Sequence, residues 1–301
     1  MTAALGLGTY RVRAAGQAAR TALPAGATWV DTAPNYGHGK AHHDLAPILA
    51  QYPDVRVATK TGFHTGAQRR AAFQAGLLSA EEAAHGHSLD PGFVRWQTED
   101  SLGTLGRADI VFVHNPEHTA HHDGIGAATD QLRAAFAELE DLALQRAIGG
   151  YGVATWSGLS RGVFSVSGLL ALACEAAGSP NHHFHGLQMP VSLVMADPID
   201  LALRGGGPLV QARDAGVVTF GSAPLHGGEL PDLMTPELVE LIRPGRSAPA
   251  AALLAAASAP GLDVVLLSAS SPGHWHDALT AVAEPLAADQ LRRVIDVLAA
   301  G

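Results

Sequence analysis

The 301-residue sequence predicts an α/β protein in which one (β/α)8 barrel, a TIM barrel, spans residues 1–301. Two observations favour this fold. Short apolar runs recur eight times along the chain, and stretches with helical apolar spacing separate most of them. Because these runs are apolar nearly throughout, instead of alternating with polar residues, they are typical of parallel strands covered on both faces.

The expected strands lie, in chain order, at 4–10, 27–31, 55–60, 109–114, 149–153, 185–189, 216–220 and 263–268. Helical spacing is clear at Leu132, Phe136 and Leu139, and again in the segment 287–301. We expect that last segment to form the eighth barrel helix or a helix packed close to it. A doubly wound open sheet is the alternative fold, and it is weakened because no G-x-G-x-x-G motif follows the first strand.

Composition excludes several classes of protein. Apolar residues make up 47% of the chain, which is enough for a sizeable core and excludes a disordered protein. A net charge of −9 without an Arg/Lys stripe makes nucleic acid an unexpected partner. The single cysteine, Cys174, cannot form an internal disulfide. The amino terminus does not resemble a signal peptide, and no apolar run is long enough to span a bilayer, so we expect a cytoplasmic protein with no membrane partner.

The use of basic residues singles out one position. The chain has 17 arginines but only two lysines, Lys40 and Lys60. Lys40 follows a glycine-rich turn and is expected on the surface, whereas Lys60 ends the apolar run VRVATK. A lysine in such a place indicates a need for a compact ammonium with an adjustable pKa, which a guanidinium does not provide.

Four polar residues are expected at the carboxyl-terminal face of the barrel, where such barrels place their active sites. Asp31, Lys60 and His114 each end a predicted strand, and Tyr36 follows five residues after Asp31. An ammonium beside a phenol lowers the phenol pKa, a carboxylate keeps the ammonium charged, and an imidazole polarises a carbonyl group. These groups donate a proton to a carbonyl oxygen, but side chains supply no hydride, so a nicotinamide cofactor is implied.

Motifs along nearly the whole chain resemble those of the aldo-keto reductase family. LGLGTYR is similar to its first barrel strand, VDTAPNYGHG to its Asp-plus-Tyr signature, VATKTG to its lysine strand and VFVHNPEH to its histidine strand. GLQMPVSL, SAPLHGG and LLSASSPGHWHDAL resemble its cofactor-binding segments. The resemblance implies a catalytic tetrad of Asp31, Tyr36, Lys60 and His114, with Tyr36 as the proton donor.

The resemblance also implies binding of NADPH or NADP. The implied cofactor-binding residues are Gly8, Thr9, Tyr10, Thr155, Gln188, Ser222, Leu225, Gly227, Ser270, Ser271, His274 and Asp277. Four positions depart from the family pattern. Ala154 and Thr155 stand where the family usually has Ser-Asn, His274 where it often has Arg for the 2′-phosphate, and Ala278 where it has the adenine-binding Asn. A histidine is a weaker phosphate partner than a bidentate arginine, so reduced NADPH affinity or relaxed selectivity against NADH is expected.

The leading functional hypothesis is therefore an NADPH-dependent oxidoreductase that reduces an aldehyde, a ketone or a related C=O or C=N group of a small molecule. The alternative is non-redox acid–base chemistry, such as elimination or cyclisation, on the same fold with weak or no cofactor binding. A binding subunit without turnover is a third possibility, and the costly Asp31–Lys60 pair speaks against it. The sequence gives no indication of the oligomeric state.

Two further expectations concern other side chains. The histidine pairs and clusters at 42–43, 121–122 and 182–185 fall in predicted loops, so exposed polar residues are favoured over a metal site. Trp156 lies just past a strand end, where it is placed to flank a substrate. Long loops at 64–90, 115–127 and 221–235, with few bulky residues, are expected to give the barrel an open, shallow and largely polar mouth.

Overall fold

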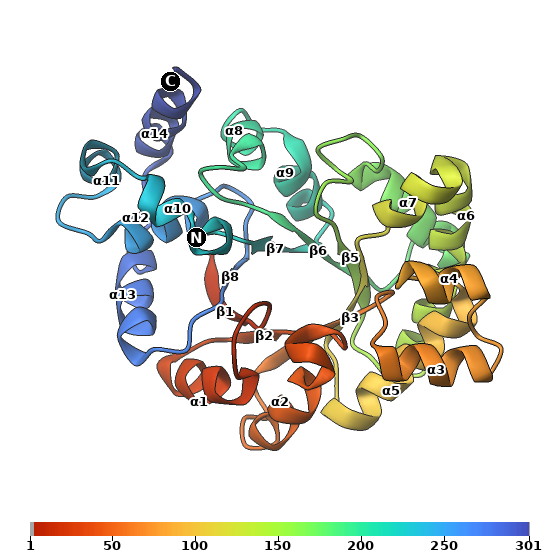
Figure 1. The fold of residues 1–301 in the computed structure, drawn as a ribbon. Coiled ribbons are helices and arrows are strands. Elements are labelled where there is room, and N and C mark those ends of the chain that lie inside the picture. The colour runs from red at the N-terminus through yellow and green to blue at the C-terminus, as the bar shows by residue number, and fades with distance from the viewer. Residues whose placement is uncertain (1–2, 301) are drawn as a thin grey trace.

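The computed structural model describes residues 3–300 and confirms the predicted barrel. Eight parallel strands follow one another around the barrel in sequence order, and the last pairs with the first to close it (Figure 1). The strands are β1 (Ala4–Gly8), β2 (Trp29–Asp31), β3 (Arg56–Thr61), β4 (Ile110–His114), β5 (Tyr151–Ala154), β6 (Phe184–Pro190), β7 (Val218–Ser222) and β8 (Val264–Leu267). Each coincides with one of the eight predicted apolar runs, with small differences at the ends.

Helices surround the strands and connect each to the next (Figure 1). The principal ones are α1 (Ala15–Ala25), α2 (Ala41–Leu49), α5 (Pro91–Leu105), α6 (Glu117–Leu144), α7 (Val166–Ala177), α9 (Gly207–Asp214), α12 (Ala248–Ala257) and α13 (Pro272–Val282). The shorter or additional ones are α3 (Gly66–Gln74), α4 (Ala80–His85), α8 (Asp197–Leu203), α10 (Leu230–Leu233), α11 (Pro236–Ile242) and α14 (Ala288–Ala300). Within residues 3–300, none of these helices combines the length and the apolar character needed to cross a bilayer.

The interior of the barrel is filled by large aromatic rings beside very small residues. The Trp29 and Phe220 rings pack edge to face with centroids 4.9 Å apart, and the Phe112 and Phe220 centroids are 5.3 Å apart. Gly152 and Gly186 make room for this packing. A Cβ atom on Gly152 would lie 1.9 Å from the carbonyl oxygen of Gly186, and one on Gly186 would lie 2.7 Å from the Phe112 ring. Interior packing therefore depends on glycine at both positions.

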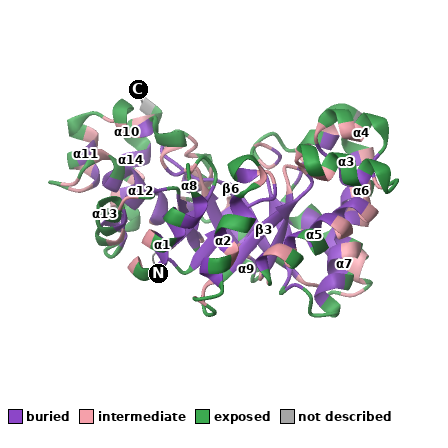
Figure 2. Ribbon diagram, turned by 60° about the horizontal axis from the view of Figure 1, so that its bottom comes forward, coloured by how far each residue is buried: buried purple, intermediate pink, exposed green. Residues whose placement is uncertain are grey.

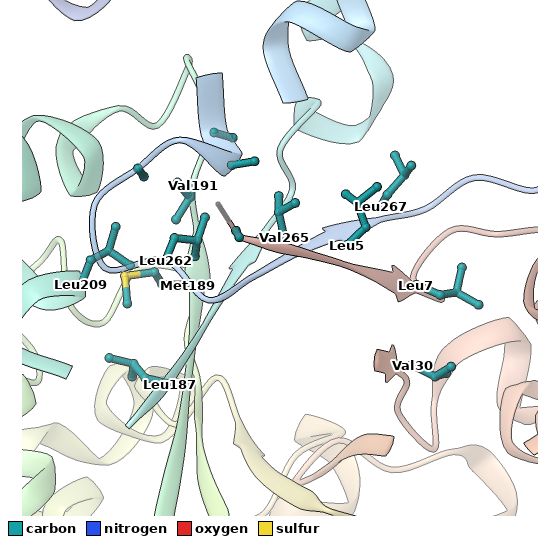
Figure 3. Packing of buried hydrophobic residues seen from close by; sticks show 14 of the residues in the cluster. Leu5, Leu7, Val30, Leu187, Met189, Val191, Leu209, Leu262, Val265 and Leu267 are labelled. Carbon is teal, nitrogen blue, oxygen red and sulfur yellow. The ribbon is translucent and has the colours of Figure 1, made fainter. Parts of the chain in front are cut away.

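A larger apolar layer lies between the strands and the helices. The barrel strands are buried, whereas the outer faces of the surrounding helices are exposed (Figure 2). Leu5 and Leu7 of β1, Val265 of β8 and Leu187 and Met189 of β6 belong to this layer (Figure 3). They alternate along their strands with residues that face the interior, because successive side chains of a strand point to opposite faces.

The prediction of three long loops is partly wrong. The segment 64–90 forms α3 and α4, each begun by a reciprocal capping box, Thr65 with Gln68 and Ser79 with Glu82. The second segment, 115–127, is mostly the start of α6, and the third, 221–235, contains a 3-10 helix η2 (His226–Gly228) and α10. Figure 1 shows α3 and α4 outside the ring of barrel strands, next to α5 and α6.

The last helix, α14, is not the eighth barrel helix, and it does not pack mainly against that helix either. The helix that follows β8 is α13, and α14 contacts α8 and α11 instead. Its apolar stripe is buried at Leu291, Val294 and Ile295. On its other side, Arg292 forms an ion pair with Asp200 of α8. The stripe is thus used in packing, as its spacing predicts.

Candidate active site

Four polar side chains point into the barrel at the carboxyl ends of its strands. Asp31 ends β2 and lies two residues after Trp29, whose ring fills the interior, so both side chains face inwards. The same alternation brings Lys60 of β3, His114 of β4 and Gln188 of β6 to the inner face. Residues far apart in the sequence therefore meet at one end of the barrel.

Asp31 and Lys60 form a buried ion pair. The Lys60 ammonium donates hydrogen bonds to both carboxylate oxygens of Asp31, at 2.6 and 2.7 Å, and to the carbonyl oxygen of Thr32 at 3.1 Å. The amide of Gln188 donates to Asp31 Oδ1 at 2.9 Å. Burial lowers the pKa of Lys60, whereas the charge and hydrogen bonds of Asp31 act in the opposite direction. The lysine side chain is only 1% exposed, so Asp31 is what allows an ammonium there.

Tyr36 lies directly above this pair, at the start of the 3-10 helix η1 (Tyr36–Gly39). The Lys60 ammonium is 5.0 Å from the centroid of the Tyr36 ring, and the ring of Tyr10 packs against it at 5.2 Å. Burial raises the pKa of Tyr36 well above 10, and the charge of Asp31 adds to this rise. The expectation that Lys60 lowers this pKa is therefore wrong, because burial of the phenol and the charge of Asp31 outweigh the effect of the ammonium. At neutral pH the phenol keeps its proton.

His114 completes the group and is neutral. Its ring is edge-on to the Tyr36 ring, with centroids 6.0 Å apart. Burial lowers the pKa of His114 well below 6.5, and the positive charge of Lys60 lowers it further. His87 fixes the backbone at this point, because its Nε2 donates to the His114 carbonyl oxygen at 2.9 Å. The structure thus brings together all four residues of the predicted tetrad.

A cavity of about 650 Å³ opens above these residues. Its walls carry four aromatic side chains, Tyr10, Tyr36, Phe63 and Trp156. The expected mouth without bulky side chains is wrong, because these aromatic residues come from short segments after β1, β2, β3 and β5 and not from the three long segments. A cavity of this size and lining is typical of a small-molecule site.

Most of the predicted cofactor-binding residues line this cavity. They are Gly8, Tyr10, Thr155, Gln188, Ser222, Leu225 and Gly227. Thr9 lies beside the cavity, buried, with its hydroxyl donating to the carbonyl oxygen of Asp31 at 2.9 Å. The backbone at Gly227 and Gly228 has φ angles of 72° and 98°, which bring the η2 turn close to the cavity without side chains in between.

The predicted adenosine-side residues lie elsewhere. Ser270, Ser271, His274 and Asp277 follow β8 and do not line the cavity. His274 and Asp277 are exposed on α13, whereas Ala278 on the same helix is buried in the core. The structure therefore places the residues predicted for the nicotinamide and pyrophosphate sides in one cavity. The residues predicted for the adenosine side, at the start of α13, lie outside it.

Sequence reasoning missed Arg11. It lines the cavity, and its Nη1 atom lies 3.0 Å from where a Cβ on Gly227 would stand. Arg11 has a φ of 59°, an uncommon conformation for a residue with a side chain, and this turns the chain after β1 back towards the cavity. The sequence signal that could have identified Arg11 is its position as a basic residue directly after Thr9 and Tyr10 in the first strand motif.

The histidine clusters behave in different ways. His42 is buried, with Nε2 3.0 Å from the Thr59 hydroxyl, so the expectation of an exposed residue is wrong there. His43 is exposed as expected, and the ring of His183 contacts the carboxylate of Glu140 at 2.6 Å. Among the residues that the structure describes, no three His, Cys, Asp or Glu side chains are arranged to hold a metal ion.

Comparisons with known proteins bear on the family and on the fold. The sequence model of the Aldo/keto reductase family matches residues 2–161. No curated protein sequence matches the chain. Among solved structures, a glycerol dehydrogenase from Gluconobacter oxydans is 20% identical, with a TM-score of 0.70 over 98% of this chain and 91% of that one.

Two further structures have a similar likeness. An aldo-keto reductase from Bacillus halodurans in its holo form is 19% identical, with a TM-score of 0.66 over 99% of this chain and 92% of that chain. An aldo/keto reductase from Klebsiella pneumoniae in complex with NADP and acetate is 17% identical, with a TM-score of 0.67 over 98% and 91%. At these identities the likeness establishes the shared fold.

Proposed function

This chain belongs to the aldo/keto reductase family of oxidoreductases, and from that premise we propose that it uses NADPH to reduce an aldehyde, a ketone or a related C=N group. The observation that carries the proposal is that Asp31, Tyr36 and His114 line one cavity, with Lys60 buried beneath them against Asp31 and Tyr36. A protonated phenol, an ion pair and a neutral imidazole at one point form a site for donating a proton to a carbonyl oxygen.

The residues around the cavity fit a nicotinamide cofactor. Thr155 and Gln188 offer polar side chains near the tetrad, and the open backbone at Gly227 and Gly228 leaves space for a pyrophosphate. Arg11 brings a cation to the same place, where it would neutralise phosphate charge. When bound, the cofactor supplies hydride to the carbonyl carbon. The side chains of the protein bind and orient the substrate and protonate its carbonyl oxygen.

Tyr36 is assigned as the proton donor. Its raised pKa keeps the hydroxyl protonated at neutral pH, and the proton passes from Oη to the substrate oxygen as negative charge develops there. The Lys60 ammonium, 5.0 Å from the ring centroid, stabilises the phenolate that remains. Asp31 keeps Lys60 charged and in place, and the neutral His114 ring donates an N–H to the same substrate oxygen.

The alternative of non-redox acid–base chemistry uses the same side chains. One observation favours it: the predicted adenosine-side residues, His274 among them, lie outside the cavity. Ala154 also lacks the hydrogen-bonding group that the family pattern has at its position. The two hypotheses differ in whether the protein binds the cofactor.

Titration of the purified protein with NADPH, followed by cofactor fluorescence, separates them. We expect saturable binding and consumption of NADPH when an aldehyde is added. Failure to bind at millimolar NADPH contradicts the reductase proposal and leaves acid–base chemistry. Binding without consumption across a panel of aldehydes and ketones contradicts the assignment of the reaction but not of the cofactor.

A further inference from the structure

Trp156 is a large apolar side chain left exposed at the mouth of the active-site cavity. It lines the cavity and is 48% exposed, although the residues on either side of it are partly or fully buried. In the barrel register His114 pairs with Ala154, the last residue of β5, so Trp156 stands two residues beyond the level of His114 in the segment that follows this neighbouring strand. Its indole ring is therefore placed beside a substrate whose carbonyl group contacts His114.

The segment that carries Trp156 is fixed by a carboxylate from another strand connection. Oε1 of Glu117, the first residue of α6, accepts hydrogen bonds from the backbone N–H groups of Trp156 at 2.8 Å and Ser157 at 2.9 Å. The Thr155 hydroxyl accepts from the N–H of Gly158 at 2.8 Å. Bonds to an ionised acceptor are stronger than neutral ones, so Glu117 determines where this turn lies.

The position of Glu117 carries a cost. Its second carboxylate oxygen, Oε2, is buried and has no hydrogen-bond partner among the described residues. A carboxylate taken from water without full hydrogen bonding is destabilising. The two backbone bonds through Oε1 offset that cost, and their effect is to hold the turn after β5 against the start of α6.

The opposite side of the mouth carries a second exposed aromatic residue. Tyr10 follows β1 and Trp156 follows β5, which is four strands away in a closed barrel of eight, so the two lie across the mouth from each other. Tyr10 is 55% exposed. Exposed aromatic faces on two sides of a cavity bind flat apolar groups well, because both faces lose contact with water on binding.

We infer that Trp156 contacts the substrate and selects carbonyl compounds with an aromatic or broad apolar group, and that Glu117 is the positioning residue that holds Trp156 in place. The inference rests on the proposed reductase function. A polar or very small substrate gains nothing from the indole face, so the discrimination between substrate classes depends on Trp156 and, through it, on Glu117.

The test compares kcat/KM for benzaldehyde and propanal with NADPH as the reductant. We expect Trp156→Ala to lower the value for benzaldehyde about tenfold, mainly through KM, and to change that for propanal by less than about twofold. Glu117→Ala should have the same selective effect. Glu117→Gln should keep kcat/KM for benzaldehyde near that of the unaltered enzyme, because an amide oxygen accepts the same two bonds. Glu138→Ala, on the distal part of α6, is the matched control and should change neither value.

A double variant separates positioning from general damage. If Glu117 acts through Trp156, Glu117→Ala adds no further loss of discrimination to Trp156→Ala. An unchanged benzaldehyde-to-propanal ratio in Trp156→Ala, which folds because it alters only an exposed side chain, contradicts the inference even if Glu117→Ala is unstable. Equal losses for both aldehydes in Glu117→Ala contradict the positioning role. No turnover of either aldehyde by the unaltered enzyme contradicts the reductase proposal itself.

Discussion

The Lys60 ammonium contacts both carboxylate oxygens of Asp31 inside the barrel, at 2.6 and 2.7 Å. The two side chains are only 1% and 5% exposed, so water cannot solvate either charge if the partner is removed. Each charge is therefore compatible with burial only while its partner is present. The pair is therefore a requirement of the fold as well as a part of the proposed proton-donating site.

Removal of one partner should be more damaging than removal of both. We expect Lys60→Met or Asp31→Leu alone to lower the free energy of unfolding by about 3–5 kcal/mol, and the double variant to lose clearly less than the sum. Urea denaturation measures all three. Arg293→Met, which breaks an exposed pair with Asp289, is the control and should cost less than about 1 kcal/mol. Strict additivity would show that the pair is not coupled in the way its geometry indicates.

Gly152 should not tolerate even one added methyl group. Its Cβ would lie 1.9 Å from the carbonyl oxygen of Gly186, which is backbone and cannot move aside as a side chain does. We expect Gly152→Ala to lower the free energy of unfolding by at least about 3 kcal/mol or to abolish folding. Gly103→Ala, at an exposed helical position with open space, is the control and should be neutral or stabilising by up to about 1 kcal/mol. Thermal unfolding compares them.

The strands and the tetrad were predictable because their signals are local. An apolar run that ends in a polar residue identifies both the strand and the polar side chains at its carboxyl end, as at Lys60 and His114. The capping box of Ser79 and Glu82 similarly marks α4. Short-range patterns of this kind need no knowledge of the rest of the chain.

What could not be predicted depends on contacts between distant segments. Glu117 is significant because it bonds to the backbone of Trp156, 39 residues away, and Arg11 because it reaches Gly227. The direction in which the Tyr36 pKa shifts also depends on burial in the folded chain. Burial raises this pKa and outweighs the lowering by the Lys60 ammonium that the motif suggests. Sequence spacing carries no information about any of these distances.

Buried neutral histidines should make the protein sensitive to mild acid. Burial lowers the pKa of His42 to about 3, below its ordinary value of 6.5. The unfolded chain therefore binds a proton that the folded one does not, and stability falls as pH decreases from about 6.5 towards 3, by up to about 1.4 kcal/mol per pH unit. His87, with its pKa lowered to about 4, acts in the same direction.

His42→Gln should remove part of that dependence. Between pH 7 and pH 5 we expect the variant to lose about 2 kcal/mol less of its unfolding free energy than the unaltered protein. The measurement is urea denaturation at several pH values, with slopes compared instead of absolute stabilities. His43→Gln, at the exposed neighbouring position, is the control. An unchanged slope in His42→Gln would mean that His42 is protonated without unfolding.

Cofactor preference should respond to His274. If this exposed residue of α13 faces the 2′-phosphate, His274→Arg replaces a weak partner with a bidentate guanidinium and should tighten NADPH binding about tenfold, with little change for NADH. Fluorescence titration with both cofactors measures this. His276→Arg adds the same charge two residues along the helix and is the control. Equal tightening of both cofactors, or an equal effect of the control, would mean that His274 does not contact the phosphate.

Tyr36→Phe should abolish turnover while leaving the fold intact. Only the hydroxyl is removed, and if it is the proton donor the rate should fall by roughly 10²–10⁴. Tyr52→Phe, three residues after the end of α2 and away from the cavity, should retain full activity. Circular dichroism and NADPH binding establish that both variants are folded. Because burial and Asp31 raise the pKa of Tyr36, activity of the unaltered enzyme should not decline at pH 10, where an ordinary phenol loses its proton. Near-full activity of Tyr36→Phe would exclude the hydroxyl as the acid.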